Sequence, residues 1–372
     1  MKRNYIGEIN NKNILFLQGP MGGFFKRLDL LFRMMGAKTC KIGFNAGDCF
    51  FSNRDNYIAY RGRREAWPEY VADFLKSHWI DQIYLFGDCR FYQRHAITAA
   101  KALGIEVFVF EEGYVRPDYI TLEKYGVNDY SSISRSRAFY DSLRLDELPE
   151  PTPKPAHFSQ PRMVGSAVVY YALSNLLFFR YPHYRHHRDF SALKELFIGG
   201  RSLLRKWYYR WSERHALRWI EAEAGNYFFV PLQTHNDFQI LEHSGYGSIE
   251  KFIDEVMGSF ARCAPVGTVT INSTVGLSSL FHGTPTITLG NAIYDIEGLT
   301  CRGMTLDDFW HEQRAPDREL FEKYRRFLIH ATQLNGSFYG EMPDFEARQI
   351  PVIAEADHKR GAAAVRLRRK RA

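Results

Sequence analysis

An abrupt change from apolar to polar side chains occurs twice in this chain, and it restricts the possible folds more than any other feature. Residues 227–232 form an apolar run that passes directly into the polar stretch 233–237. Residues 107–110 form a second run, which passes into Glu111 and Glu112. The carboxyl end of a buried parallel strand has this pattern where the sheet opens into a ligand crevice. An ordinary polar loop after a core strand gives the same pattern, so each junction alone fits either interpretation.

The first part of the chain alternates between two kinds of segment. Short apolar runs predict strands and amphipathic segments predict helices. The expected strands are 14–17, 41–44, 81–86 and 106–110, and the expected helices are 24–35, 67–78 and 95–103. Strands that alternate with helices indicate an α/β fold with a doubly wound parallel sheet over residues 10–125.

A glycine-rich turn joins the first expected strand to the first expected helix. Gly19, Gly22 and Gly23 lie in this turn, without the spacing of a dinucleotide-binding fingerprint. Backbone N–H groups at the start of the helix can face an anion, so this turn is a candidate binding loop.

The middle of the chain differs in composition from both ends. Four alternating prolines within residues 149–155 predict an extended linker. Residues 163–223 have a helical pattern that is rich in aromatic and basic side chains. Such a region suits a membrane surface or an amphiphilic acceptor. It fits equally well a helical hairpin whose aromatic side chains form a core.

A second α/β unit is expected from residue 227 onward. Its expected strands are 227–232, 269–271 and 286–289, its first helix is 248–261, and the remainder to residue 335 has a helical pattern. Ser273 and Thr274 follow the second of these strands and occupy the N-cap position of a helix. This helix start again presents N–H groups to an anion.

Charge and cysteine content limit the possible function classes. The net charge is +7, and residues 359–371 contain seven Lys and Arg without an acidic residue, so the remainder is close to neutral. That tail fits a solvated, disordered end, and it could also bind anionic lipid. No nucleic-acid motif accompanies it, so we expect no nucleic-acid partner. Five scattered cysteines fit a reducing cytosol. The longest apolar stretch, 164–179, is interrupted by polar residues and too short to span a membrane.

Five stretches together resemble one family, the KpsS-type capsule polysaccharide biosynthesis proteins of Gram-negative bacteria. These stretches are residues 18–25, 86–95, 109–123, 230–240 and 272–300. The resemblance implies a GT-B-like fold, in which two Rossmann-like domains face a cleft. It also implies a cytoplasmic protein, peripheral at the inner membrane, with other capsule assembly proteins as possible partners.

The implied activity is transfer of β-Kdo, an eight-carbon acidic sugar, from CMP-β-Kdo to a phosphatidylglycerol-type lipid. Donor and product share the β configuration, so the reaction retains stereochemistry, which calls for a carboxylate nucleophile and a nearby acid/base carboxyl. The resemblance assigns Asp237 as the nucleophile and Glu112, or its neighbour Glu111, as the acid/base. No metal and no cofactor is implied, because CMP-Kdo is a substrate.

The resemblance also implies binding residues. Arg116 is a candidate for the sugar carboxylate, because a guanidinium pairs with a carboxylate in a bidentate fork. The alternative for Arg116 is a structural ion pair with Asp118 or Glu123. The other donor-side candidates are Gln233, His235, Asn236, Asn272, Ser273, Thr274 and Gly276, and the acceptor-side candidates are Gly19, Gly22, Gly23, Asp88 and Arg90.

One departure from the family pattern concerns the second domain. Family members carry a strand with a Lys-His-His-Pro motif before the Asn-Ser-Thr turn, whereas here residues 263–268 lead directly into 269–272. A segment of several elements is therefore expected to be absent. Only three strands are expected between 227 and 289, although a nucleotide-binding Rossmann domain usually has about five or six. A catalytically impaired scaffold protein of a capsule assembly and export complex is the alternative function.

These observations give five expected regions. They are an N-terminal Rossmann-like domain on the acceptor side (10–148), a linker (149–162), a helical aromatic and basic insertion (163–224), a shortened C-terminal CMP-sugar-binding domain (225–335) and a tail with a basic end (336–372).

Overall fold

The computed structural model divides into two compact units, each built from separate segments of the chain. Unit 1 contains Met1–Ser132, Pro151–Leu196 and Ile329–Ala372, and unit 2 contains Ile133–Glu150 and Phe197–Leu328. The expected domain boundaries stay a prediction. The structure describes residues 8–184, 192–222, 230–232, 244, 246, 248–260, 267–312 and 314–345.

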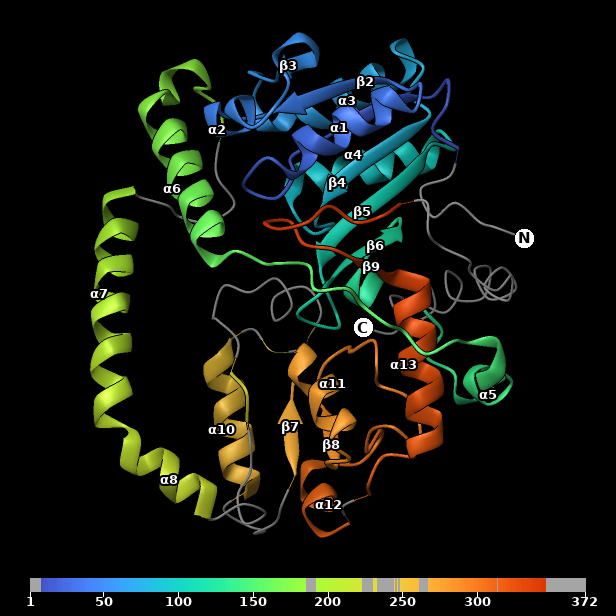
Figure 1. The fold of residues 1–372 in the computed structure, drawn as a ribbon, viewed down its shortest axis with the longest axis vertical. Helices are drawn as coiled ribbons and strands as arrows, with labels where there is room; N and C mark the ends of the chain where they lie inside the picture. Colours follow the sequence, from blue (N-terminus) through green and yellow to red (C-terminus); the bar gives the residue numbers. More distant parts are fainter. Residues whose placement is uncertain are drawn as a thin grey trace. The chain divides into compact units, whose positions relative to one another are not determined.

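Unit 1 is built on a mixed sheet of seven strands in the order β3-β2-β1-β4-β5-β6-β9 (Figure 1). The first five strands run parallel to one another. The alternating pattern predicted four of them, and β3 was not predicted. They are β3 (Tyr57–Ala59), β2 (Lys38–Gly43), β1 (Asn13–Phe16), β4 (Gln82–Phe86) and β5 (Glu106–Glu112).

The last two strands correct the prediction of a wholly parallel sheet. β6 (Tyr119–Lys124) and β9 (Gln333–Asn335) are both antiparallel to their neighbours. β5 extends to Glu112, so both glutamates lie on the strand and not in the loop after it. The prediction that the chain is helical up to residue 335 was wrong over residues 290–305, which contain no helix, and at β9. β9 is a Gln-Leu-Asn segment too short to be recognised as a strand, and it forms one by pairing with the edge of β6.

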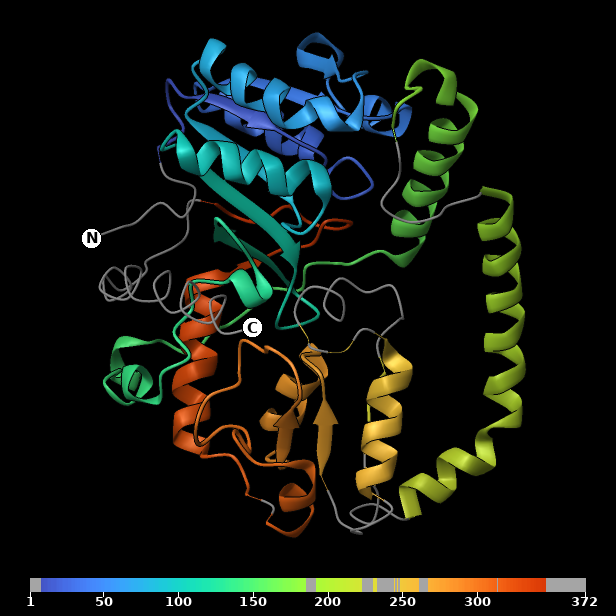
Figure 2. The same cartoon turned by 180° about the vertical axis from the view of Figure 1, so that it is seen from behind.

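Both faces of this sheet are buried, because side chains along each central strand alternate between two cores. Leu15 of β1 belongs to one hydrophobic cluster, while Ile14 and Phe16 belong to the other. Helix α1 (Phe24–Met34) contributes to the cluster around Phe16, and α3 (Trp67–Ser77) and α4 (Phe91–Ala102) contribute to the cluster around Leu15. Figures 1 and 2 show these helices on opposite faces of the sheet. All three helices were predicted, although α4 begins four residues earlier than expected.

Helix α6 (Gln160–Leu176) completes unit 1. No helix or strand occupies residues 151–159, as expected of the proline-rich linker. The Ser159 hydroxyl then caps α6 by accepting a hydrogen bond from the backbone N–H of Arg162 over 3.4 Å. Tyr170 is buried against α2 (Ala46–Phe50), whereas much of the opposite side of α6 is exposed.

Two further helices confirm the helical pattern of the aromatic and basic region. They are α7 (Ala192–Ser212) and α8 (Arg214–Ala222). Trp207, Trp211 and Trp219 keep 77, 66 and 64% of their surface exposed, so these side chains do not form the core of a hairpin.

The core of unit 2 forms around two short parallel strands, β7 (Thr268–Thr270) and β8 (Thr286–Thr288). Besides α8 and most of α7, unit 2 contains the helices α5 (Arg137–Asp141), α10 (Ile249–Phe260), α11 (Thr274–Phe281), α12 (Leu306–His311) and α13 (Arg318–Thr332). The last of these continues into unit 1. Residues 230–232 carry no strand, and the rest of the strand expected at 227–232 lies outside the described residues. Short 3-10 turns occupy Arg54–Asn56, Arg64–Ala66, Asn128–Tyr130, Leu145–Glu147 and Phe178–Arg180.

Candidate functional site

The carboxyl ends of three neighbouring parallel strands bring together the predicted residues of unit 1. The glycine loop 18–23 follows β1, the loop 87–90 follows β4, and Glu111 and Glu112 end β5. Ligands bind at this end of parallel strands in open α/β sheets. The structure therefore collects most of the predicted acceptor-side residues at one edge.

The protein strongly perturbs the pKa of Glu111 at this edge. Burial raises the pKa of Glu111 to about 7, while a hydrogen bond from the backbone N–H of Glu112 and the positive charge of Arg90 act in the opposite direction. The Glu112 N–H donates to Oε1 over 3.0 Å. A Cβ added at Gly87 would lie 3.7 Å from Glu111 Oε2 and 3.8 Å from Arg90 Nε, so both side chains flank Gly87. A carboxyl half protonated near neutral pH suits acid/base chemistry.

Glu112 lies in a different environment from its neighbour. Its side chain reaches solvent, and the protein around it raises the pKa of the carboxyl, whereas Arg116 lowers it. Arg116 is exposed, and its Nε donates to the Gly113 carbonyl oxygen over 3.3 Å. Among the described residues Arg116 forms no ion pair with either Asp118 or Glu123, so the structural alternative for this arginine is not observed.

Asp88 has a structural role at this edge of the sheet, because its carboxylate holds neighbouring segments by hydrogen bonds. Its Oδ2 accepts a hydrogen bond from the backbone N–H of Val127 over 2.8 Å, and its Oδ1 accepts one from Cys89 Sγ over 3.2 Å. These bonds fix the loop after β4. Arg90 follows in the same loop, with its guanidinium carbon 5.3 Å from the centre of the Phe86 ring.

The glycine loop has a shape that larger residues would disturb. Gly22 has φ of +142°, and a Cβ there would lie 3.3 Å from Ser166 Oγ. A Cβ at Gly19 would lie 2.7 Å from the Phe25 ring. Gly23 is the N-cap of α1 and has no side chain that could accept a hydrogen bond. The first backbone N–H groups of the helix therefore remain available to other partners.

A buried polar cluster beside this loop was not predicted. Asp48 accepts hydrogen bonds from Gln18 Nε2 at 3.2 Å and from the Tyr170 hydroxyl at 3.0 Å. Asn45 Nδ2 donates to the same hydroxyl at 2.6 Å, and Gln18 Nε2 also lies 3.4 Å from the Tyr184 hydroxyl. The spacing of Asn45 and Asp48 is an N-cap signal, since Asn45 Oδ1 accepts from the Asp48 N–H at 2.9 Å. The contact with Tyr170 had no signal in the sequence.

A buried cation lies close to this cluster. Lys41 Nζ donates to the Phe51 carbonyl oxygen over 3.3 Å. Burial raises the pKa of Asp48, and the charge of Lys41 opposes this rise. Burial lowers the pKa of Lys41, and Asp48 is the main opposing influence. Each of these two groups therefore opposes the effect of burial on the pKa of the other.

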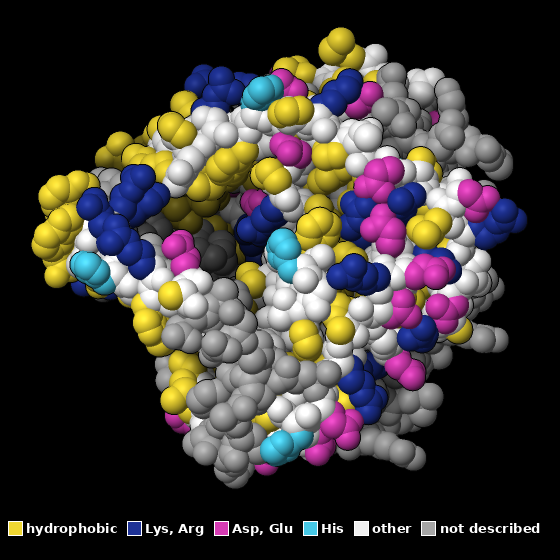
Figure 3. Space-filling model, turned by 60° about the horizontal axis from the view of Figure 1, so that its bottom comes forward, with side chains coloured by type: hydrophobic (Ala, Val, Ile, Leu, Met, Phe, Trp, Pro, Cys, Tyr) yellow, Lys and Arg dark blue, Asp and Glu magenta, His cyan; other side chains and the backbone are white. Residues whose placement is uncertain are grey.

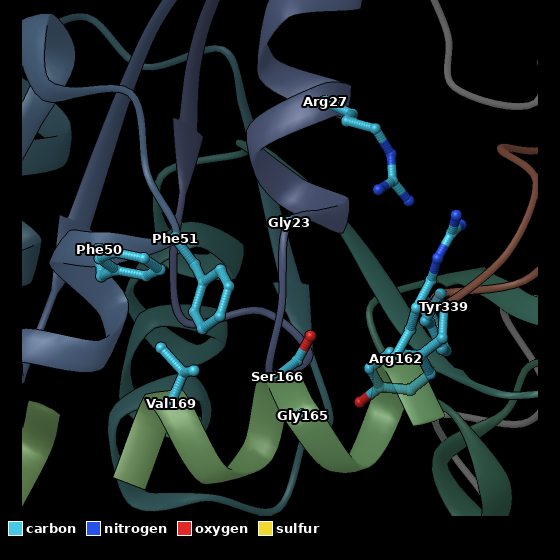
Figure 4. A pocket seen from close by; sticks show the side chains of 10 residues that line it. Gly23, Arg27, Phe50, Phe51, Arg162, Gly165, Ser166, Val169 and Tyr339 are labelled. Carbon is cyan, nitrogen blue, oxygen red and sulfur yellow. The ribbon is translucent and has the colours of Figure 1, made fainter. Parts of the chain in front are cut away.

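A cavity of about 340 Å³ opens next to the glycine loop (Figure 4). It is lined by parts of α1, of α6 and of the segment at Phe338 and Tyr339. Burial raises the pKa of Tyr339 to about 12, and the negative charge of Glu112 adds to this rise. Tyr339 thus connects the cavity to the carboxyl groups at the end of β5.

The predicted helix start in unit 2 is confirmed. Ser273 is the N-cap of α11, and its hydroxyl accepts from the Val275 N–H over 3.3 Å. The Tyr294 hydroxyl donates to the Ser273 carbonyl oxygen, and a Cβ at Gly276 would overlap that hydroxyl. Asn272 is buried at the end of β7. A role for these residues toward a CMP phosphate stays a prediction.

Several predicted residues lie outside the described residues. They are Gln233, His235, Asn236, Asp237 and the basic residues of 359–371. The part of the chain that the structure describes contains no cluster of three or more His, Cys, Asp or Glu side chains suited to a metal ion. Among the helices described, none combines the length and apolar character that a membrane span requires.

Comparisons with known proteins agree with the resemblance in the sequence. Residues 81–268 and 266–339 match the model of a family described as capsule polysaccharide biosynthesis protein. The chain is 34% identical to the capsule polysaccharide export protein KpsS of Escherichia coli, over 89% of this chain and 98% of that protein. It is 33% identical to the capsule polysaccharide modification protein LipB of Neisseria meningitidis serogroup A, over 89% of this chain and 92% of that protein. A solved structure of S. aureus MnaA with UDP covers 89% of this chain and 93% of that chain, at 8% identity and a TM-score of 0.27.

The same comparisons fit the expected absence of an internal segment. The family match breaks off and resumes at residues 266–268. The alignment with the Escherichia coli relative spans 383 positions, while only 89% of the 372 residues of this chain take part, so about 50 of those positions have no counterpart here. That the missing positions belong to the second domain stays a prediction.

Proposed function

Because this chain belongs to the capsule polysaccharide biosynthesis family, we propose that it transfers β-Kdo from CMP-β-Kdo to a phosphatidylglycerol-type lipid. The product starts the linker on which capsule chains are built. The proposed reaction retains the β configuration and proceeds through two displacements within a GT-B-like arrangement.

The observation that carries this proposal is the environment of Glu111. Its pKa of about 7 lets the carboxyl both donate and accept a proton near neutral pH. Glu112, the other acid/base candidate, also has a raised pKa. Raised carboxyl pKa values at the ligand-binding end of a parallel sheet are typical of acid/base residues.

The proposed mechanism uses two carboxylates in sequence. Asp237 attacks the anomeric carbon of Kdo, and the bond to the CMP phosphate oxygen breaks, so that CMP leaves with the bonding electron pair. A hydroxyl oxygen of the lipid then attacks the same carbon and displaces Asp237. Glu111, or its neighbour Glu112, takes the proton of that hydroxyl as the new glycosidic bond forms.

The donor-binding assignment rests on two features. Arg116 is exposed and forms no ion pair with a described residue, so it is available for the carboxylate of Kdo. The start of α11, at Ser273 and Thr274, offers N–H groups and the positive end of the helix dipole to the CMP phosphate.

The proposed location is the cytoplasmic surface of the inner membrane. Helices α7 and α8 expose Trp207, Trp211 and Trp219 beside basic side chains such as Arg205 and Arg210. Figure 3 shows apolar side chains next to Lys and Arg side chains at its left edge, the side on which α7 lies in Figure 1. Exposed aromatic and basic side chains on one helix favour binding to an anionic lipid surface.

The experiment that tests the proposal is mass spectrometry of a lipid acceptor after reaction. Purified protein is incubated with CMP-Kdo generated in situ and lysophosphatidylglycerol, and we expect the lipid to gain the mass of Kdo. The Asp237→Ala and Glu111→Gln variants should lose this product while staying folded by circular dichroism. Undiminished turnover in both variants would contradict the proposed mechanism.

A second candidate function is a non-catalytic scaffold in a capsule assembly and export complex at the inner membrane. The break in the family match at residues 266–268 favours it, because a shortened nucleotide domain binds its donor less well. A folded wild-type protein that associates with membranes but neither binds CMP nor forms product would support the scaffold.

A further inference from the structure

The cavity beside the glycine loop has a charged end built from two helices. Arg27 of α1 and Arg162 of α6 both line it, and their guanidinium groups point toward each other (Figure 4). Neither forms an ion pair with a described residue, in contrast to Arg33 of the same α1 helix, which pairs with Asp29 at 3.2 Å and with Asp55 at 2.5 Å.

Two facing guanidinium groups without a carboxylate are electrostatically unfavourable. Burial, followed by the positive charge of Arg162, lowers the pKa of Arg27. An anion placed between the two groups would remove this repulsion and accept charge-assisted hydrogen bonds from both. The arrangement therefore favours a ligand with a negative charge.

Polar groups surround the charged end. Ser166 of α6 and Tyr339 line the cavity, together with Gly23 at the uncapped start of α1. Hydroxyl donors and the first N–H groups of a helix are suited to phosphate oxygens.

The other end of the cavity is apolar and opens to solvent. Phe50, Phe51 and Val169 lie there, away from the two arginines (Figure 4). Phe50 is 55% exposed and Val169 is 38% exposed. Val168 on the same helix is 53% exposed, so apolar surface continues along α6 beyond the cavity.

We propose that this cavity binds an amphiphile whose phosphodiester head lies between Arg27 and Arg162 and whose acyl chain lies along Phe50, Phe51 and Val169. The proposal rests on the proposed function in one respect, since it names the place where that reaction holds its lipid acceptor. Binding itself requires no donor and no turnover.

The test is isothermal titration calorimetry of the full chain with dihexanoyl phosphatidylglycerol below its micelle concentration. Glycerophosphoglycerol supplies the same head without acyl chains, and octyl glucoside supplies an apolar chain without an anion. We expect the complete amphiphile to bind at least about tenfold more tightly than either part, because apolar burial and charge-assisted hydrogen bonds both contribute. Equal binding of glycerophosphoglycerol would identify a free phosphodiester as the ligand and overturn the lipid assignment.

Charge variants separate this site from general attraction. Arg27→Gln and Arg162→Gln should each weaken binding about tenfold or more, because each removes charge-assisted hydrogen bonds. Lys26→Gln is the matched control, since Lys26 precedes Arg27 on α1 and does not line the cavity. Unchanged affinity in both arginine variants, or an equal loss in Lys26→Gln, would overturn the proposal.

A steric variant tests the cavity without removing charge. Gly165 lines the cavity, and a Cβ added there meets no atom within 4 Å. Gly165→Phe should block binding, whereas Gly165→Ala should leave it nearly unchanged and favour the helix. Full binding by a folded Gly165→Phe protein would contradict the site. Loss of sugar transfer with intact lipid binding would reject the proposed function and leave this inference standing.

Discussion

The hydroxyl of Tyr170 donates a 3.0 Å hydrogen bond to buried Asp48, a residue 122 positions earlier in the chain. This contact joins α6 to the edge of the parallel sheet. Because α6 also forms one wall of the cavity, the cluster around Asp48 sets the position of that wall.

Tyr170→Phe is expected to destabilise the protein by about 1–3 kcal/mol. The change leaves buried Asp48 and Asn45 each without one hydrogen-bond partner, and an unsatisfied buried group costs about that amount. Urea denaturation measures the effect. Tyr208→Phe is the control, because Tyr208 is 54% exposed and its hydroxyl forms no hydrogen bond among the described residues. Equal stability of the two variants would show that the cluster contributes little.

Glu111 should make stability depend on pH. Its pKa of about 7 lies above the 4.5 of an unperturbed glutamate, so between these values the folded state binds more protons than the unfolded state. Stability therefore falls as pH rises from about 4.5 to 7, by up to about 3 kcal/mol. Glu111→Gln should lose this dependence and be more stable than wild type at pH 8. Exposed Glu69→Gln should follow the wild-type curve, and urea denaturation at pH 5 and pH 8 compares all three proteins.

The titration of the Glu111 carboxyl should also affect the pH dependence of the rate of sugar transfer. If Glu111 exchanges the proton in the proposed reaction, a plot of kcat/KM against pH should change slope near pH 7. Glu111→Gln should remove that change along with most of the activity. A change of slope that persists in a residually active Glu111→Gln protein would assign it to another group.

Gly22→Ala should destabilise unit 1 by about 1–3 kcal/mol, the usual cost of a strained backbone conformation. Gly22 has φ of +142° and an added Cβ would lie 3.3 Å from Ser166 Oγ. Gly104→Ala is the matched control, since Gly104 has φ of +70° and open space for a Cβ. Thermal unfolding should show the larger loss for Gly22→Ala. A larger loss for Gly104→Ala would mean that contact with α6 does not restrict the loop.

The double substitution Trp207→Ser and Trp211→Ser should reduce binding to anionic vesicles at least about tenfold, since each exposed indole inserts apolar surface into the lipid. Vesicle co-sedimentation measures the loss. Trp79→Asn is the control because Trp79 is similarly exposed, at 78%, and lies in unit 1 at φ of +46°, which asparagine tolerates. An equal loss in the control would point to nonspecific adsorption.

The sequence predicted the helices and strands whose own side-chain pattern is sufficient to identify them. Strands β1, β4 and β5 are apolar runs long enough to be buried on both faces, and the glycine turn and acidic pair marked one end of the sheet. β9 could not be found in this way, because Leu334 is the one apolar residue of a three-residue segment that becomes a strand through pairing with β6.

The candidate site was predictable to a similar extent. Arg90 and the glycine loop follow strand ends and Glu111 lies near the end of β5, so the local pattern placed them on one edge. Arg27 and Arg162 are ordinary basic residues of two helices, and only the packing of α6 brings them together. The roles of Asp237 and the donor-side residues stay predictions.

The pairing of β9 with β6 has a consequence for synthesis on the ribosome. Gln333 donates to Thr121 Oγ1 over 3.0 Å and lies 212 residues later in the chain. At a translation rate of about 5–20 residues per second, this separation corresponds to roughly 10–40 s during which the open side of β6 has no partner strand. An unpaired edge of this kind attracts other extended chains. A chaperone that covers this edge would prevent such association during the interval. A foreign domain fused after residue 345 would leave the length of the interval unchanged.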